Sequence, residues 1–251
     1  MRALQAAVAA AAWIGITFST IFWTSLIALV YAGHRLWDPQ LKLAHRLASI
    51  WGQGLVRMAP GTRVRLAGKE RIPAHRPVIF MANHQSYVDV PALFFVPAQF
   101  KWMADVDLFR IPVFGWAMAM AGYIPVLRGD GREGVRALQK AERLLKQGIS
   151  IFIFPEGTRS HTGVLGRFQS GGFRLAAMTG TPIIPVVVSG TRQMLPRGDW
   201  VFRWGVRVWI DLLPLVEPPA QRRELRLWME KVRGLMRKAY ARRIKDFRES
   251  C

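Results

Sequence analysis

A histidine and an aspartate five positions apart follow an apolar run that ends at Ala82, in the segment VIFMANHQSYVD. His84 would stand at the carboxyl end of a buried strand, the edge at which α/β sheets usually place their active sites. The backbone must turn for Asp89 to reach it, and Pro91 supports that turn because the first turn of a helix tolerates proline. A neutral imidazole can accept a hydroxyl proton while a carboxylate fixes its tautomer. The pair indicates general-base chemistry, and the alternative is a helix-capping aspartate beside a polar strand end.

A second motif, FPEGTRS at residues 154–160, follows the apolar run Ile149–Phe154. Because parallel strands end at the same edge of a sheet, we expect this motif to lie beside His84. Glu156 and Arg159 flank a Gly-Thr turn, and a guanidinium can hold a phosphate with two hydrogen bonds. Glu156 could orient a hydroxyl of an acceptor or pair with Arg159. The alternative is a strand-to-loop turn held by that ion pair.

The elements that must position these motifs alternate along the chain from about residue 61. Continuous apolar runs are typical of strands buried on both faces. Their alternation with helical stretches predicts an α/β domain over residues 61–216, with a mostly parallel central sheet flanked by helices. The expected strands are Thr62–Leu66, Val78–Met81, Tyr123–Leu127, Ile149–Phe154, Ile183–Val188 and Val206–Leu212, and the expected helices are Val90–Val96, Arg132–Gln147 and Gly172–Thr179.

The N-terminus predicts a membrane-embedded helical segment over residues 1–37. No charged residue occurs from Ala3 to Gly33, and about 20 apolar residues suffice to span a bilayer. A signal peptide would have a shorter apolar region and a small-residue cleavage site. One long tilted helix and a helix broken near Gly15 or Ser19 both fit the sequence. More positive charge follows the segment than precedes it, so the positive-inside rule places the main domain in the cytoplasm, at a bacterial inner membrane.

Two amphipathic helices are expected on either side of the α/β domain. The first, within residues 38–60, has a cap and a first-turn proline in Asp38-Pro39 and is expected to lie along the bilayer surface. The second, within residues 217–251, carries an apolar stripe that begins at Leu225 and a strongly basic opposite face. That face could be a solvated surface or could lie against anionic lipid.

The composition favours a membrane protein. Lys and Arg total 36 against 16 Asp and Glu, a net charge of +20, and 51% of residues are hydrophobic. Such a surface attracts phosphate, on nucleic acid or on an anionic membrane. The basic residues are spread along the chain without a recognisable DNA or RNA module, which argues against a nucleic-acid partner. Cys251 is the only cysteine, so an intramolecular disulfide is impossible.

Four motifs in register resemble those of the lysophosphatidic acid acyltransferase family, the 1-acyl-sn-glycerol-3-phosphate acyltransferases. NHQSYVD at residues 83–89 matches the first, and YIPVLR, which ends at Arg128, matches the second. FPEGTRS matches the third without a change, and the Pro-Ile-x-Pro-Val strand at Pro182–Val186 matches the fourth. The resemblance covers roughly residues 62–215.

This resemblance implies direct attack of a lysophosphatidate hydroxyl on an acyl thioester, giving phosphatidic acid. His84 would be the base and Asp89 its partner. The donor would be acyl-coenzyme A or acyl-carrier protein, with no metal and no other cofactor, and anionic membrane lipid would be a further partner. The acceptor would be bound by Glu156, Gly157, Thr158, Arg159 and Arg128.

The chain departs from the family pattern at two places. After Lys101 many relatives carry a second lysine and a Glu-Leu pair, where this chain has Ala104–Leu108, and a lysine is common at the position of Gln169. Lys101 remains a secondary phosphate candidate. Because both changes remove positive charge, other acceptors stay open: a lyso-ornithine lipid, another lysophospholipid or glycerol-3-phosphate. Two alternatives come from other classes: a membrane-bound nucleic-acid-binding protein and a non-catalytic membrane-shaping protein. The presence of both His84 and Asp89 argues against the membrane-shaping protein.

Overall fold

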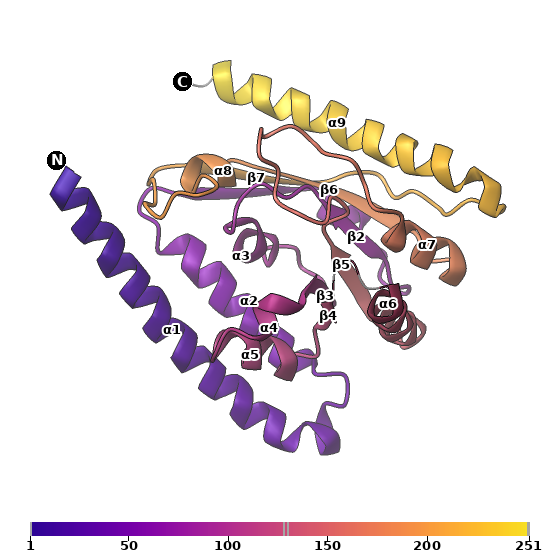
Figure 1. Ribbon diagram of the computed structural model, residues 1–251, viewed down its shortest axis with the longest axis horizontal. Helices are drawn as coiled ribbons and strands as arrows, with labels where there is room; N and C mark the ends of the chain where they lie inside the picture. The colour runs from indigo at the N-terminus through magenta and orange to yellow at the C-terminus, as the bar shows by residue number, and fades with distance from the viewer. Residues whose placement is uncertain (1, 128, 130, 250–251) are drawn as a thin grey trace.

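A central sheet with helices on both faces forms the body of the protein in a computed structural model, which describes residues 2–127, 129 and 131–249 (Figure 1). The strands are β1 (Arg63–Ala67), β2 (Ile79–Ala82), β3 (Phe100–Asp105), β4 (Ile124–Val126), β5 (Ser150–Ile153), β6 (Ile183–Ser189) and β7 (Arg207–Leu212). The helices are α1 (Arg2–Trp37), α2 (Lys42–Arg57), α3 (Asp89–Leu93), α4 (Val106–Phe109), α5 (Phe114–Met120), α6 (Gly131–Lys146), α7 (Ser170–Thr179), α8 (Thr191–Met194) and α9 (Leu225–Glu249), with 3-10 turns at Lys69–Arg71 and Arg222–Glu224.

The seven strands lie in the order β1-β7-β6-β2-β5-β3-β4. All neighbours are parallel except β6 and β7, which pair antiparallel. β2 lies at the centre between β6 and β5, so the segment that follows it emerges in the middle of the carboxyl edge. The predicted α/β class with a mostly parallel sheet is confirmed.

The strands bury both of their faces, which divides the core into two layers. Along β2, Phe80 and Ala82 point to the layer under α2 and α3, while Ile79 and Met81 point to the layer under α6, α7 and α9. All four side chains are fully buried. Burial on both faces is the reason that the strand sequences are continuously apolar rather than alternating.

The sequence located β1, β2, β4, β5, β6 and β7 to within two residues at each end, but β3 was not predicted. β3 reads FKWMAD, and Lys101 and Asp105 interrupt the apolar pattern on which the prediction depended. The expected helices at Val90–Val96, Arg132–Gln147 and Gly172–Thr179 correspond to α3, α6 and α7.

Helix α1 runs unbroken from Arg2 to Trp37, so the alternative of a break near Gly15 or Ser19 is wrong. Its segment Gln5–His34 is long and apolar enough to cross a membrane, and only 11% of its most apolar window is buried. The helix also lies against the domain. Its Trp13 indole donates to the Trp200 carbonyl (2.8 Å). Thr20, Thr24 and Ile27 line an apolar pocket shared with α2 and α5.

Helix α2 begins at Lys42, four residues later than expected, because Leu41 adopts a left-handed conformation (φ 53°). The capping role predicted for Asp38 holds, since its carboxylate accepts from the backbone amides of Lys42 (2.9 Å) and Leu43 (2.7 Å). The apolar face of α2 packs into the protein core, where Ala44, Ala48 and Val56 are buried. That the helix lies along the bilayer surface stays a prediction.

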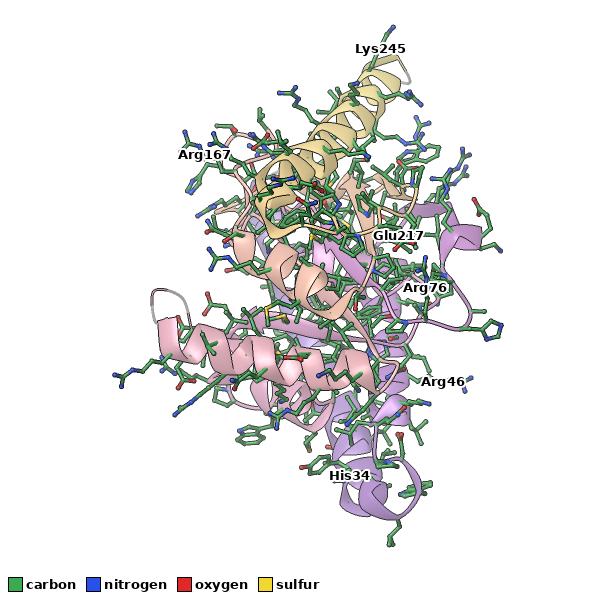
Figure 2. The ribbon with its side chains drawn as sticks, turned by 90° about the vertical axis from the view of Figure 1, so that its right-hand side faces the viewer. His34, Arg46, Arg76, Arg167, Glu217 and Lys245 are labelled. Atoms are coloured by element: carbon green, nitrogen blue, oxygen red, sulfur yellow. The ribbon has the colours of Figure 1, made fainter. Side chains whose placement is uncertain are left out.

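Helix α9 belongs to the core of the domain. Trp228, Val232 and Met236 are buried in the layer that also holds α6 and α7. At the far end of the helix the Arg243 guanidinium forms two 2.5 Å hydrogen bonds to Asp211 on β7. Figure 2 shows Lys245 of α9 and His34 of α1 at opposite ends of the molecule, so the basic face of α9 lies across the sheet from α1.

Candidate active site

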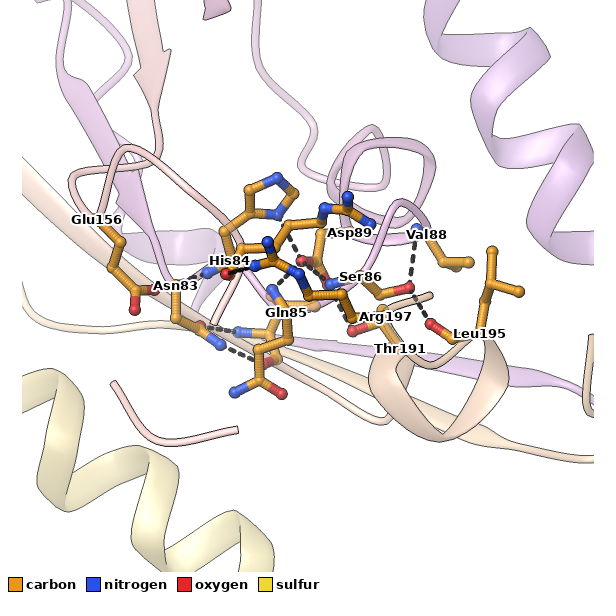
Figure 3. A network of polar contacts seen from close by, with 12 residues as sticks. Asn83, His84, Gln85, Ser86, Val88, Asp89, Glu156, Thr191, Leu195 and Arg197 are labelled. Carbon is orange, nitrogen blue, oxygen red and sulfur yellow. Dashed lines mark hydrogen bonds and ion pairs between the residues drawn. The ribbon is translucent and has the colours of Figure 1, made fainter. Parts of the chain in front are cut away.

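The chain turns sharply where it leaves β2, and a side-chain tether fixes that turn. The Asn83 side chain is almost fully buried, and its amide group donates to the Val188 carbonyl and accepts from the Val188 N–H, both at 2.8 Å. The Asn83 side chain thereby pairs with the backbone of β6 just beyond the last paired residue of β2. His84 therefore starts from a fixed point on the carboxyl edge of the sheet (Figure 3).

The Asp89 carboxylate is completely buried and accepts hydrogen bonds from four donors. Oδ2 accepts from His84 Nδ1 (2.7 Å) and from the backbone amides of Gln85 (2.5 Å) and Ser86 (2.8 Å). Oδ1 accepts from the Thr191 hydroxyl (2.5 Å). A carboxylate held from both sides keeps the imidazole proton on Nδ1, which leaves the lone pair on Nε2 available to accept a proton.

The His84 ring is packed but not fully buried. It stacks on Phe154 with 3.9 Å between ring centroids and an interplanar angle of 14°. Phe154 in turn stacks on Trp102 of β3. The His84 side chain is 16% exposed, so the ring is fixed by Asp89 and Phe154 yet still reaches the surface. This geometry suits a general base better than a buried structural histidine.

The backbone of His84 is held by the FPEGTRS turn. Its N–H donates to Glu156 Oε1 (2.9 Å), and its carbonyl accepts from the Ser160 N–H (2.7 Å). Glu156 Oε2 accepts from the Gly166 N–H (2.6 Å). Burial raises the pKa of Glu156, although both amide hydrogen bonds and the neighbouring His84 oppose that shift.

Glu156 therefore serves a different purpose from the one predicted. We expected it to orient an acceptor hydroxyl or to pair with Arg159. Instead both oxygens accept from the chain's own amides, and the side chain is buried. Glu156 joins the loop at Gly166 to the backbone of His84, and so it acts on the position of the imidazole.

Arg159 lies at the rim of the site. Its guanidinium stacks over the Tyr87 ring, 3.6 Å from the centroid, and its carbonyl accepts a hydrogen bond from Arg197. Because Tyr87 belongs to the turn between His84 and Asp89, the arginine lies at the same edge of the sheet as His84, as predicted. Thr158 is exposed, and Gly157 adopts a positive φ (71°) that closes the turn.

Lys101 lies away from His84 and the FPEGTRS turn. It pairs with Ile151 on β5, two residues before that strand ends at Ile153, which is about 7 Å at strand spacing. Its fully buried ammonium donates to the carbonyls of Leu41 and Ala121, each at 2.8 Å. Burial lowers its pKa to about 7. Lys101 thus fastens the α1–α2 junction to the sheet and is not placed to bind the phosphate. Arg128, the other predicted cation, lies outside the described residues.

Comparison with known proteins places this site in a family. A family model described as Acyltransferase matches residues 63–189, which include both motifs. The chain belongs to the acyltransferase family.

Two of its relatives are named as the same enzyme. The chain is 38% identical over 181 residues to the chloroplastic 1-acyl-sn-glycerol-3-phosphate acyltransferase LPAT1 of Arabidopsis thaliana, covering 70% of this chain and 50% of that protein. It is 33% identical over 156 residues to the 1-acyl-sn-glycerol-3-phosphate acyltransferase of Pseudomonas aeruginosa, covering 61% and 58%. The chain thus spans half to three fifths of the length of these relatives.

A crystal structure of an acyltransferase, PlsC from Thermotoga maritima, resembles the whole chain. The TM-score is 0.80 at 27% identity, with 96% of this chain and 97% of that chain covered. That structure is described as a 1-acyl-sn-glycerophosphate acyltransferase. The likeness extends beyond the matched family model to α1 and α9.

Two elements outside the acyltransferase motifs complete the site in this chain. Thr191, which begins α8, binds Asp89 across 102 residues of sequence. From α9, Arg233 Nε donates to the Gly166 carbonyl (3.0 Å), and Tyr240 lies beside the buried Gln85 side chain. Burial raises the pKa of Tyr240. The sequence placed α9 as a basic surface helix and gave no sign of these contacts.

The acidic and histidine side chains of this acyltransferase-family site are used in pairs and with backbone amides. Among the described residues, no three His, Cys, Asp or Glu side chains come together as a metal site would require.

Proposed function

We propose that this protein transfers a fatty acyl group from an acyl thioester to the sn-2 hydroxyl of 1-acyl-glycerol-3-phosphate, giving phosphatidic acid. The observation that carries the proposal is the His84–Asp89 hydrogen bond of 2.7 Å at the open edge of the sheet. It occupies Nδ1 and leaves Nε2 of the fixed imidazole outside that contact, on a side chain that is 16% exposed. The names of the relatives supply the substrate class.

The reaction needs one base and no enzyme nucleophile. Nε2 of His84 takes the proton of the acceptor hydroxyl, and the oxygen attacks the thioester carbonyl carbon. The C–O bond forms and the C–S bond breaks, and the leaving thiolate takes the proton from the imidazolium. Asp89 stabilises the imidazolium in between, because its carboxylate accepts from Nδ1 throughout.

Arg159 is the group proposed to bind the acceptor phosphate. It stands beside the His84 turn, and stacking on Tyr87 holds its guanidinium plane at the rim. A guanidinium can donate two parallel hydrogen bonds to a phosphate. Thr158 and Gly157 form the adjacent turn, where the exposed Thr158 side chain can add a hydroxyl to the phosphate contact, while the Gly157 N–H already donates to the Phe154 carbonyl (3.0 Å).

The acceptor reaches this site from a bilayer in which we place α1. The helix exposes large apolar side chains along its length, among them Ile14 (57%), Phe18 (69%) and Leu29 (74%). It also contacts the domain at both Trp13 and Ile27, about 21 Å apart along the helix axis. The domain therefore stays against the membrane surface. The charge asymmetry around α1 favours the cytoplasmic face of a bacterial inner membrane, and anionic lipid suits the net charge of +20.

The donor in the proposal is acyl-coenzyme A or acyl-carrier protein, and no cofactor is required by the steps above. The strongly basic surface attracts either one, since both present phosphate or carboxylate groups. A side-by-side assay with the two thioesters decides the donor.

An acceptor panel tests the acceptor. The purified full chain is given labelled acyl-coenzyme A and, in turn, lysophosphatidate, glycerol-3-phosphate, another lysophospholipid and lyso-ornithine lipid. We expect transfer to lysophosphatidate to be fastest. A phosphate-free acceptor that outperforms lysophosphatidate would overturn the acceptor assignment and leave the reaction type standing.

The role of Arg159 is tested in the same assay. Arg159→Ala should raise the apparent KM for lysophosphatidate by about 10-fold or more, because it removes a hydrogen bond between two charged groups. The KM for a phosphate-free acceptor should change little. Arg167→Ala is the matched control, because Arg167 is an exposed arginine on the same loop (Figure 2). An equal change in the two variants would remove Arg159 from the phosphate site.

A further inference from the structure

We propose that residues 196–205, here named the aromatic loop, form a second contact with the lipid bilayer at the rim of the candidate active site. The loop connects α8 to β7. The proposal concerns binding to lipid, so it stands independently of which acceptor the site uses.

The loop presents aromatic side chains to the surface beside arginine. Trp200 is 49% exposed and Trp204 is 40% exposed, and the Trp204 ring stacks on Phe202. The side chain of Arg203 between them is 62% exposed. Tryptophan with nearby cationic side chains is typical of the membrane–water interface, where the ring is buried among headgroups and its N–H stays hydrated.

The shape of the loop is set by its own hydrogen bonds. Asp199 Oδ1 accepts from the backbone amides of Trp200 (2.8 Å) and Val201 (3.1 Å), and the backbone N–H of Arg203 donates to the Met194 carbonyl (2.8 Å). The exposed indoles are therefore held outward by an ordered turn, although their exposure to water is unfavourable.

The loop continues the surface of α1. Trp13 of α1 donates its indole N–H to the Trp200 carbonyl, and its ring lies 5.2 Å from that of Phe202. Ile14 and Phe18, which follow Trp13 along α1, are more than half exposed. Figure 1 shows the N-terminal half of α1 beside the loop after α8. A bilayer that receives α1 thus meets Trp200 and Trp204 as well. This continuity selects lipid over a soluble partner as the occupant.

The loop also touches the site. The carbonyl of Leu195, directly before the loop, accepts from the Ser86 hydroxyl (2.7 Å), within the turn that joins His84 to Asp89. Arg197 of the loop donates to the carbonyl of Arg159. One short segment therefore connects the proposed lipid contact with both motifs, and a lysolipid in the adjacent leaflet lies next to the edge that carries His84.

A probe attached to the loop tests the contact without relying on activity. Cys251 is the only native cysteine, so Trp200→Cys in a Cys251→Ser background carries one environment-sensitive fluorophore. Leu227→Cys is the matched control, since Leu227 is 75% exposed and belongs to α9, the helix that lies across the sheet from α1. The full chain is reconstituted in vesicles of phosphatidylethanolamine and phosphatidylglycerol, with and without lipids that carry a nitroxide quencher at the headgroup.

The proposal predicts a blue-shifted probe at position 200 that is quenched several-fold more than the probe at position 227. Equal quenching at the two positions, or an emission at position 200 typical of water, would overturn it. The measurement does not depend on acyl transfer, so it can be interpreted even if the proposed function is wrong.

A kinetic comparison tests the position of the contact beside the site. In Trp200→Ser/Trp204→Ser we expect the apparent KM for a vesicle-borne acceptor to rise by about 10-fold, while the KM for a short-chain, freely dispersed acceptor stays within a factor of two. A KM that rises equally for both acceptors, or for neither, would contradict entry of the acceptor beside the loop. The probe result decides the lipid contact by itself.

Discussion

The Thr191 hydroxyl donates a 2.5 Å hydrogen bond to Asp89 Oδ1, the carboxylate oxygen that His84 does not use. Thr191 begins the helix after β6, and Asp89 follows β2, the neighbouring strand. Both side chains are completely buried. The hydrogen bond therefore fixes the carboxylate from behind, and the strand pair beneath it sets the direction in which the imidazole faces.

Replacing Thr191 should reduce turnover through Asp89. Thr191→Val keeps the shape and removes the donor, and we expect kcat to fall by about 10-fold with the acceptor KM unchanged, because a hydrogen bond to a charged group contributes roughly 1.5–3 kcal/mol. Thr191→Ser should restore most of the rate. Steady-state kinetics on the three proteins measure this, and a serine variant as slow as the valine variant would contradict the role of the hydroxyl.

Glu156→Gln separates a positioning role from a substrate-binding one. The amide can accept from only one of the two backbone N–H groups at His84 and Gly166, so one of them loses its partner at a cost of about 1–3 kcal/mol. We expect a lower Tm and a lower kcat with an unchanged acceptor KM. A raised KM with an unchanged Tm would instead show direct contact with the acceptor.

Removing the contact between α9 and the Gly166 loop should slow the reaction. Arg233→Met retains the apolar stem and loses the hydrogen bond to the Gly166 carbonyl, so kcat should fall by roughly 3- to 10-fold, as expected for loss of about 1 kcal/mol. Arg237→Met, at an exposed position of the same helix, is the control. If both variants lose the same activity, the effect belongs to the charge of α9 and the positioning role is refuted.

Lys101 makes stability depend on pH. Burial lowers its pKa from 10.5 to about 7, so between these values the unfolded chain carries a proton that the folded chain lacks. The free energy of unfolding therefore rises with pH across this window, by at most about 1.4 kcal/mol per pH unit from this group. Lys101→Met removes that contribution. Denaturant unfolding in detergent should give a wild-type minus variant difference that grows from pH 7 to pH 10. A constant difference would show that Lys101 keeps its proton.

Contacts between residues close in sequence could be predicted from the sequence. The apolar run before His84 predicted β2, and Pro91 predicted a helix start near Asp89, from which their contact follows. FPEGTRS was correctly placed on the same edge because it follows another apolar strand. The local pattern carries this information, since strand ends and helix starts are determined over a few residues.

Contacts between segments far apart in the chain could not be predicted from the sequence. Thr191 and Arg233 meet the site from elements far along the chain, and nothing in their local pattern distinguishes them from other polar residues. Lys101 illustrates the reverse error, in which a charge that suggested phosphate binding is buried under the α1–α2 junction. Glu156 was found as a site residue, but its partners depend on the fold of residues 156–166.

The transfer rate of His84→Ala tests the central claim most directly. The variant and the wild-type full chain are reconstituted in the same vesicles with lysophosphatidate and labelled acyl-coenzyme A, and His75→Ala, at an exposed histidine, serves as the control. If His84 is the general base, its removal should lower kcat/KM by about 10³-fold while circular dichroism and vesicle binding match the wild type, and His75→Ala should keep full activity. A His84→Ala protein that transfers acyl groups at the wild-type rate would contradict the account.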